Sequence, residues 1–282
     1  MNELDWIDFL KNRVPKNNRV LAGIGDDCAL VRVGGEKILL KSDMFIEGVH
    51  FKVNTTSYEN IGLRSAARVF SDFAACAGLP RFIGVSAGIP VYVKEKNVKK
   101  ILDGILKICG QYNCALVGGD TARSNRLFLD VWGVGTAPRF IARDTAGVGD
   151  VIFVSGPLGA RAFNQPFEPR IAEAKYLALN HKVTAMIDIS DGFIVDLYRL
   201  IRASNKGACL AAENIPLTRG KSDMYRGEDY ELIFTVDKND PYLKKLERKY
   251  YRVGVIKSAG FGYMAQCRGK TRPVDIKGYL QF

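Results

Sequence analysis

Histidine is scarce in this 282-residue sequence, and its six cysteines show no pattern typical of a metal site. The two histidines stand alone, and no C-x-x-C pair occurs anywhere in the chain. Structural zinc sites require four cysteine or histidine ligands at short, regular spacings. The sequence therefore argues against a zinc site, and we interpret the cysteines as small core residues of a protein in a reducing compartment.

Long apolar runs are also missing. No segment approaches the roughly 18 uninterrupted apolar residues of a membrane-spanning helix. The first ten residues mix Asp and Glu with apolar side chains, unlike a signal peptide. We therefore expect a cytoplasmic protein that does not enter a membrane.

Neither of the two best-known nucleotide-binding motifs is present. The chain has no G-x-x-x-x-G-K-[ST] segment, which excludes a P-loop, and no H-R-D with D-F-G, which excludes the protein-kinase arrangement. A nucleotide would therefore have to bind through another fold.

Positive charge is in excess, with a formal net charge of +11. The densest basic runs, 94–100 and 244–249, have helical spacing and contain acidic residues, which is typical of solvated helix faces. Nucleic-acid binding stays open as an alternative that no motif supports. A basic surface that attracts a small anionic substrate fits the charge equally well.

The composition, 47% hydrophobic and 25% charged, is that of a globular protein, and the length fits two domains. In the first half, alternating patterns predict an α/β domain with strands near 37–40, 82–89, 114–117 and 127–135 and helices near 60–76 and 98–112. A Gly- and Pro-containing segment at 137–150 then interrupts the pattern. We place the boundary there, with domains at 1–137 and 138–282.

The second half predicts an α+β domain. A strand at 151–155 opens it, a helix follows from about 171, and the turn at 188–192 leads into a helix that ends near 202. The later strands are expected at 231–236, 251–256 and 263–266, with a helix between the first two.

Aspartates fall in glycine-rich or strand-end turns. They occur in G-I-G-D-D (23–27), S-D (42–43), S-D (71–72), G-G-D-T (118–121) and D-I-S-D-G (188–192). Mg²⁺ prefers carboxylate and water oxygens, and glycine lets a phosphate approach the backbone. Any one of these segments alone could be an ordinary turn or helix cap. Together they predict a multi-metal phosphate site.

Asp72 differs from the other aspartates because it lies inside a predicted helix, between Phe70 and Phe73. An unpaired carboxylate is costly to bury. We therefore expect Asp72 to have a metal ion or a cationic side chain as its partner.

Six sequence blocks together resemble thiamine-monophosphate kinase. They are G-I-G-D-D-C-A (23–29), S-D-M-F-I-E-G-V-H-F (42–51), S-D-F-A-A (71–75), L-V-G-G-D-T (116–121), I-D-I-S-D-G (187–192) and G-E-D-Y-E-L (227–232). The blocks follow the family's order over most of the chain. E-G-V-H-F and G-E-D-Y-E-L are the most discriminating.

The resemblance implies the ATP-binding fold of aminoimidazole-ribonucleotide (AIR) synthetase. In that two-domain architecture an α/β N-terminal domain binds ATP and Mg²⁺ and pairs into a homodimer, and an α+β domain follows. The implied reaction is the ATP- and Mg²⁺-dependent phosphorylation of thiamine monophosphate to thiamine diphosphate by direct in-line transfer, with no nucleic-acid or membrane partner.

The resemblance also implies roles for individual residues. The implied Mg²⁺ ligands are Asp27, Ser42, Asp43, Asp72, Asp120, Asp188 and Asp191. The implied ATP contacts are Gly119, Asp120, Arg143, Ser190 and Tyr112. The implied substrate contacts are His50, Glu228 and Tyr279. The residues assigned to catalysis are Asp72, Asp120 and Arg143.

Without the family context, His50 would be interpreted as a packed structural histidine, and Arg143 could pair with Asp144 or Asp150. The chain also departs from the family: 159–186 and 216–227 are shortened, and Arg226 stands where glycine is expected. Two alternatives therefore stay open. One is an enzyme of the same superfamily with a different phosphorylated or carboxylated substrate, and the other is a nucleotide-binding relative without turnover.

Overall fold

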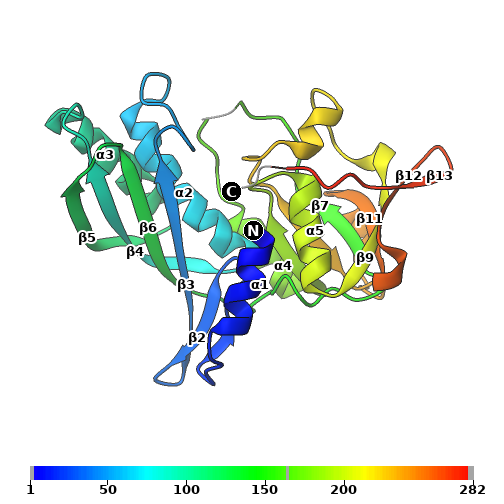
Figure 1. Ribbon diagram of the computed structural model, residues 1–282. Coiled ribbons are helices and arrows are strands. Elements are labelled where there is room, and N and C mark those ends of the chain that lie inside the picture. Colours follow the sequence, from blue (N-terminus) through cyan, green and yellow to red (C-terminus); the bar gives the residue numbers. More distant parts are fainter. Residues whose placement is uncertain (1–2, 163–164, 279–282) are drawn as a thin grey trace.

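The computed structural model of the chain describes residues 3–162 and 165–278. Its two halves each build a mixed sheet, and helix α2 (Tyr58–Ala75) lies between them (Figure 1). Among the described residues, no helix is both long and apolar enough to cross a bilayer. The six cysteines are free thiols, four of them buried, as expected of core residues.

The first sheet has the strand order β1-β2-β3-β6-β4-β5. Its strands are β1 (Val20–Ala22), β2 (Ala29–Val33), β3 (Glu36–Ile46), β4 (Leu79–Ile89), β5 (Ala115–Arg123) and β6 (Phe128–Thr136). Of the strand pairs described in this sheet, only β4–β5 is parallel. The edge strand β5 is therefore three positions away from β3, which carries Asp43.

Helices α2 and α3 (Glu95–Gln111) pack together against one face of this sheet. Ser57 caps α2 by accepting a hydrogen bond from the Asn60 backbone N–H. Glycine permits close contact of the two helices, because a Cβ at Gly62 would lie 1.9 Å from the Ile101 carbonyl oxygen. The close packing fixes α2, and with it Asp72, against the sheet.

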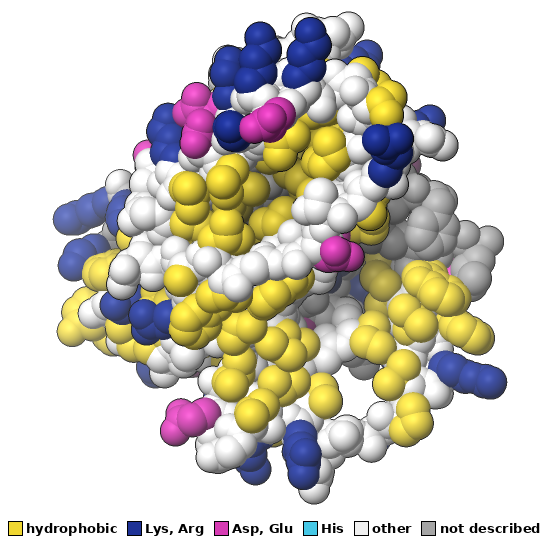
Figure 2. Space-filling model, turned by 90° about the vertical axis from the view of Figure 1, so that its left-hand side faces the viewer, with side chains coloured by type: hydrophobic (Ala, Val, Ile, Leu, Met, Phe, Trp, Pro, Cys, Tyr) yellow, Lys and Arg dark blue, Asp and Glu magenta, His cyan; other side chains and the backbone are white. Residues whose placement is uncertain are grey.

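The opposite face of the first sheet carries exposed apolar side chains. Leu39 and Phe45 of β3 point to the helices and are buried, whereas Leu40 and Met44 alternate with them and are exposed. Phe82 of β4 is exposed as well. Figure 2, a view from the side of β4 and β5, shows apolar side chains gathered there.

The second sheet has the order β13-β12-β9-β11-β7-β10-β8. Its strands are β7 (Val151–Val154), β8 (Val183–Asp188), β9 (Lys206–Ala211), β10 (Leu232–Val236), β11 (Tyr251–Ser258), β12 (Tyr263–Cys267) and β13 (Lys270–Pro273). The helices of this half are α4 (Ile171–Asn180), α5 (Phe193–Ala203) and the short α6 (Leu243–Leu246).

The central strands of this sheet are buried on both faces, which explains their uninterrupted apolar sequences. Phe153 and Phe234 face one side and join a core that continues through α2 to Val131 of the first sheet. Ile152 and Ile233 face the other side, toward α5. The two halves of the chain therefore share one hydrophobic core around α2.

The α/β and α+β characters predicted for the two halves are confirmed, and most predicted strands and helices are present within a few residues. Among the described residues, one α-helix and five strands were not anticipated: helix α1 (Glu3–Arg13) and strands β1, β2, β8, β9 and β13. Asp188, predicted in a turn, is the last residue of β8. The boundary placed after residue 137 stays a prediction and lies in the connection between β6 and β7.

Candidate active site

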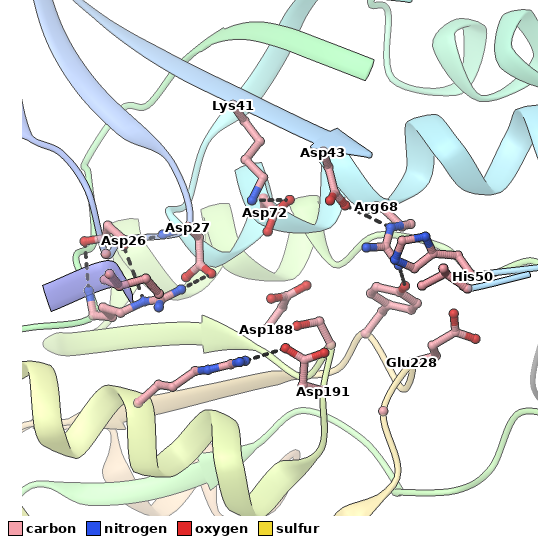
Figure 3. A pocket seen from close by; sticks show the side chains of 18 of the residues that line it. Asp26, Asp27, Lys41, Asp43, His50, Arg68, Asp72, Asp188, Asp191 and Glu228 are labelled. Carbon is pink, nitrogen blue, oxygen red and sulfur yellow. Dashed lines mark hydrogen bonds and ion pairs between the residues drawn. The ribbon is translucent and has the colours of Figure 1, made fainter. Parts of the chain in front are cut away.

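A cavity of about 370 Å³ lies between the two halves and is lined by seven carboxylates and five basic side chains. In Figure 3, Asp27, Asp72 and Asp188 lie in its middle, with Asp26 at one end and His50 and Glu228 at the other. The cavity therefore has an acidic centre and two chemically different ends.

Different elements bring the central carboxylates together. Asp27 follows the turn after β1, Asp72 projects from α2, and Asp188 ends β8. Each of these three residues has one carboxylate oxygen in a group in which all three oxygens lie within 4.8 Å of one another. Ser71, next to Asp72 on α2, donates a hydrogen bond of 2.6 Å to Asp188 and so ties the two halves together at this point.

The acidic centre has too little positive charge of its own. Burial raises the pKa of Asp72 well above its ordinary value; Lys41 opposes this rise, but the charges of Asp188 and Asp43 add to it. Burial and the charge of Asp27 raise the pKa of Asp188 to about 7. One buried oxygen of Asp27, Oδ2, also has no hydrogen-bond partner among the described residues. This donor set fits hard divalent cations such as Mg²⁺, which would relieve the repulsion.

Basic side chains surround the acidic centre. Lys41 Nζ lies 3.1 Å from Asp72 Oδ2, and Arg68 Nε lies 2.8 Å from Asp43 Oδ2. The expectation that buried Asp72 has a cationic partner is thus confirmed. Burial raises the pKa of Asp43, but Arg68 and Lys41 outweigh this effect and lower the pKa below its ordinary value.

Arg143 lies at the end of the cavity marked by Asp26. Its guanidinium pairs with Asp27 and approaches Asp26 to 4.0 Å. Its backbone N–H also donates to Asp26 Oδ2. The alternative pairing of Arg143 with Asp144 or Asp150 is therefore wrong, because the guanidinium is turned inward to the acidic centre.

His50 lies at the other end, stacked on Phe45. Its Nδ1 accepts a hydrogen bond of 2.9 Å from the Ile46 backbone N–H. Burial and the charge of Arg68 lower the pKa of His50 to about 4, so the ring is neutral at physiological pH. Because Nδ1 accepts, Nε2 carries the proton and is available as a donor.

Glu228 lies at the same end and pairs with Arg64 at 2.8 Å. The side chain of Arg64 is only 1% exposed. The second oxygen of Glu228, Oε2, is buried and has no hydrogen-bond partner in the part of the chain that the structure describes. Glu228 adopts a left-handed conformation with φ of 70°, which is uncommon for a residue other than glycine. An unsatisfied buried acceptor in a cavity is suited to a ligand that donates a hydrogen bond.

The two C-terminal motifs hold each other in place. The Glu228 backbone N–H donates to the Ser190 carbonyl, and the Tyr230 backbone N–H donates to that of Ile189. Gly227 permits this contact, because a Cβ there would lie 2.4 Å from the Ser190 oxygen. Ser190 and Glu228 are thereby fixed at the same cavity wall.

Asp196 shapes the loop that precedes α5. Its Oδ2 accepts hydrogen bonds from the backbone N–H groups of Ser190, Asp191 and Gly192. This role was not predicted from the sequence. The sequence signal for it was an acidic residue in the first turn of a predicted helix, where a carboxylate can accept hydrogen bonds from the free backbone N–H groups at the helix start.

Nine of the residues implied by the resemblance line this one cavity. They are Asp27, Asp43, His50, Asp72, Arg143, Asp188, Ser190, Asp191 and Glu228. Six residues with polar side chains that were not predicted as site residues also line it: Asp26, Lys41, Arg68, Arg199, Arg226 and Tyr230. Arg68 could have been found, since it lies one helical turn before Asp72.

Four predicted residues lie away from the cavity within one chain. The Ser42 side chain points to the opposite face of the first sheet and donates to Asp130 at 2.7 Å. Gly119 and Asp120 are in the edge strand β5. Tyr112 ends α3 and donates to the Pro169 carbonyl in a separate groove. Tyr279 lies outside the described residues.

Comparison with known proteins shows two family matches. Residues 25–137 match the model of the AIR synthase related protein, N-terminal domain, and residues 164–264 match that of its C-terminal domain. The chain is 30% identical to the thiamine-monophosphate kinase of Aquifex aeolicus (strain VF5), over 88% of this chain and 90% of the relative. It is 31% identical to that of Buchnera aphidicola subsp. Acyrthosiphon pisum (strain APS), over 86% and 85%.

A solved structure is similar over the full length. The structure described as "AaThiL complexed with AMPPCP and TMP" has a TM-score of 0.85 to this chain at 28% sequence identity. The match covers 100% of this chain and 97% of that one.

Proposed function

Because the chain belongs to the AIR synthase related family, and within it to the thiamine-monophosphate kinases, we propose that it transfers the γ-phosphoryl group of ATP to thiamine monophosphate. The neighbour solved with AMPPCP and TMP supports an ATP-like donor and this acceptor. The product is thiamine diphosphate.

One observation carries this proposal: the acidic centre lies between two ends of different chemistry. Arg143 and Ser190 would bind the triphosphate, and His50 and Glu228 would bind the acceptor. Asp27, Asp72 and Asp188, with Asp43 and Asp191 beside them, would hold Mg²⁺ between the two. The two phosphate groups then meet where the carboxylates converge.

Positioning does most of the catalysis in this proposal. The attacking phosphate oxygen is already ionised at neutral pH, so no side chain has to remove a proton, and the neutral ring of His50 agrees with a donor role. Mg²⁺ bound at the acidic centre supplies the charge that offsets repulsion between the phosphates. Arg143 and His50 hold the two phosphates in line for direct transfer, without a covalent intermediate.

A second copy of the chain would complete this site. Strand β2 pairs with β3 only over residues 36–40, and β5 ends the sheet, so two stretches of strand edge carry no partner among the described residues. The exposed apolar face lies between these edges. A homodimer that joins the β5 edge of one protomer to residues 41–46 of the other would bury that face.

The same pairing accounts for Gly119 and Asp120. Within one chain, β6 and β4 separate β5 from β3. In the proposed homodimer, β5 of one protomer lies directly beside Ser42 and Asp43 of the other. Asp120 would then add a carboxylate to its partner's metal site, and the Ser42 backbone could add an oxygen.

The acceptor assay tests the proposal directly. Purified protein with ATP and Mg²⁺ is expected to form thiamine diphosphate, identified by mass, from thiamine monophosphate but not from thiamine. Excess EDTA is expected to abolish turnover, because the repulsion at the acidic centre is then uncompensated.

Two results would contradict it. Thiamine diphosphate formation in excess chelator would remove the metal from the mechanism. ATP binding without any transfer to thiamine monophosphate would mean that the shortened second half has changed the acceptor or that turnover has been lost.

Glu228→Gln is expected to raise the KM for thiamine monophosphate about tenfold, since a hydrogen bond to a charged group contributes about 1.5–3 kcal/mol. The substitution removes the negative charge of the carboxylate and keeps the shape of the side chain. Steady-state kinetics with either substrate varied would measure the effect, and the KM for ATP should stay unchanged. An equal rise in both KM values would place Glu228 outside the acceptor end.

A further inference from the structure

Lys41 places a positive charge inside the acidic centre. It lies on β3, two residues before Asp43 and on the same face of the strand. Its Nζ is 3.1 Å from Asp72 Oδ2, and its side chain is 23% exposed. Figure 3 shows it reaching from the strand toward Asp72, beside the carboxylates that could hold a metal ion.

The position of this lysine is fixed by the fold. Leu39 before it and Phe45 after it face the same side and are fully buried, so the strand cannot turn Lys41 outward without exposing them. A lysine side chain loses rotamer freedom when it is held in one place. The ion pair with Asp72, inside an excess of carboxylates, offsets this loss.

The charges around Lys41 explain why it stays there. Asp72, Asp43 and Asp27 act on its ammonium group with negative charge, and the basic side chains of the cavity pair elsewhere: Arg68 with Asp43 and Arg143 with Asp27. Lys41 thus forms the ion pair with Asp72, and Asp72 lies in the middle of the acidic centre.

We propose that Lys41 is a resident cation of the metal site: its ammonium group occupies one cation position next to Asp72, so the chain binds one divalent ion fewer than its carboxylates could hold. This proposal deepens the metal binding proposed above and rests on it. An ammonium group has three N–H donors, and those not used by Asp72 can contact the phosphate of a bound substrate.

Counting bound Mn²⁺ tests the proposal without using turnover. Free Mn²⁺ is measured by electron paramagnetic resonance during titration of the full-length protein. Lys41→Ala is expected to bind one more Mn²⁺ per chain than the wild type, because a cation position is vacated. Lys41→Arg, which keeps the charge, and Lys37→Ala, at an exposed position of the same strand, are expected to bind the wild-type number.

Thermal unfolding gives a second readout. In EDTA, Lys41→Ala is expected to unfold at a lower temperature than the wild type, and saturating Mn²⁺ is expected to raise its Tm more than that of the wild type. If Lys41→Ala does not fold, Lys41→Gln removes the charge at similar length and should also bind the additional ion.

The outcomes separate this proposal from the proposed function. Equal Mn²⁺ numbers in the wild type and the charge-removing variants, with wild-type turnover intact, would overturn only the role of Lys41. One bound ion in Lys41→Ala and none in the wild type would support Lys41 and overturn the metal-dependent mechanism. No binding in either protein would overturn both.

Discussion

Replacing Asp72 by asparagine is expected to lower the kcat of thiamine diphosphate formation by about a thousandfold or more, in line with the loss of a charged group that organises a phosphoryl-transfer site. Asp72 is central: its carboxylate lies within 4.8 Å of those of Asp27 and Asp188 and pairs with Lys41. Asparagine keeps the shape but not the charge, so fewer divalent ions would bind.

The fold should survive this change. Asp72 is buried among other carboxylates, so removing its charge also removes repulsion, which offsets the loss of its pairing with Lys41. Circular dichroism and thermal unfolding would confirm a folded variant. Asp103→Asn, on the exposed face of α3, is the matched control and should keep wild-type kcat. A kcat for Asp72→Asn within tenfold of the wild type would remove Asp72 from the proposed mechanism.

Asp120→Asn is expected to have a similarly large effect, although Asp120 is far from the cavity of its own chain. In the proposed homodimer each site combines Asp72 of one protomer with Asp120 of the other. A dimer of one Asp72→Asn chain and one Asp120→Asn chain then contains one site with both changes and one intact site. Mixing the two inactive variants should therefore restore activity.

The expected recovery is about a quarter of the wild-type activity when subunits exchange at random in a two-fold symmetric dimer. Co-expression of the two variants with different tags allows the mixed dimer to be purified, and this dimer, with one intact site of two, should have about half of the wild-type activity. Asp72→Asn mixed with Asp43→Asn is the matched control, because both residues belong to the same cavity and no mixed dimer has an intact site. If Asp120 served its own chain, the first mixture would stay as inactive as the control.

The sequence predicted the acidic centre better than its surroundings. Each aspartate sits in a short motif that can be recognised without a structure. The basic partners of the aspartates cannot be recognised in this way, because the sequences around Lys41 and Arg68 resemble an ordinary strand and an ordinary helix. Their roles depend on which faces of β3 and α2 meet, and only the packing decides this.

The strand period bears on one prediction, that Ser42 and Asp43 both bind Mg²⁺. Ser42 and Asp43 are consecutive residues of β3, so their side chains must point to opposite faces and cannot both face one metal ion within a chain. The position of β5 at the edge of the sheet, in contrast, could not be derived from the sequence. The strand order is set by long-range pairing, which local patterns do not contain.

Strand β8 was missed for a related reason. Its sequence V-T-A-M-I-D is short and not strictly alternating, because the strand is buried on both faces. The turn signal of the following Asp-Gly segment was visible, whereas the strand that carries Asp188 into the cavity was not.

The shared core around α2 also bears on how substrates reach the site. Two domains joined by a small polar contact can swing apart and admit a ligand between them. Here Phe153 and Phe234 of the second half pack into the same apolar core as Val131 of the first, so opening by a hinge would expose that core to water. Nucleotide and vitamin phosphate would then enter and leave through the mouth of a rigid cavity, and only the loops at its rim would have to move during the catalytic cycle.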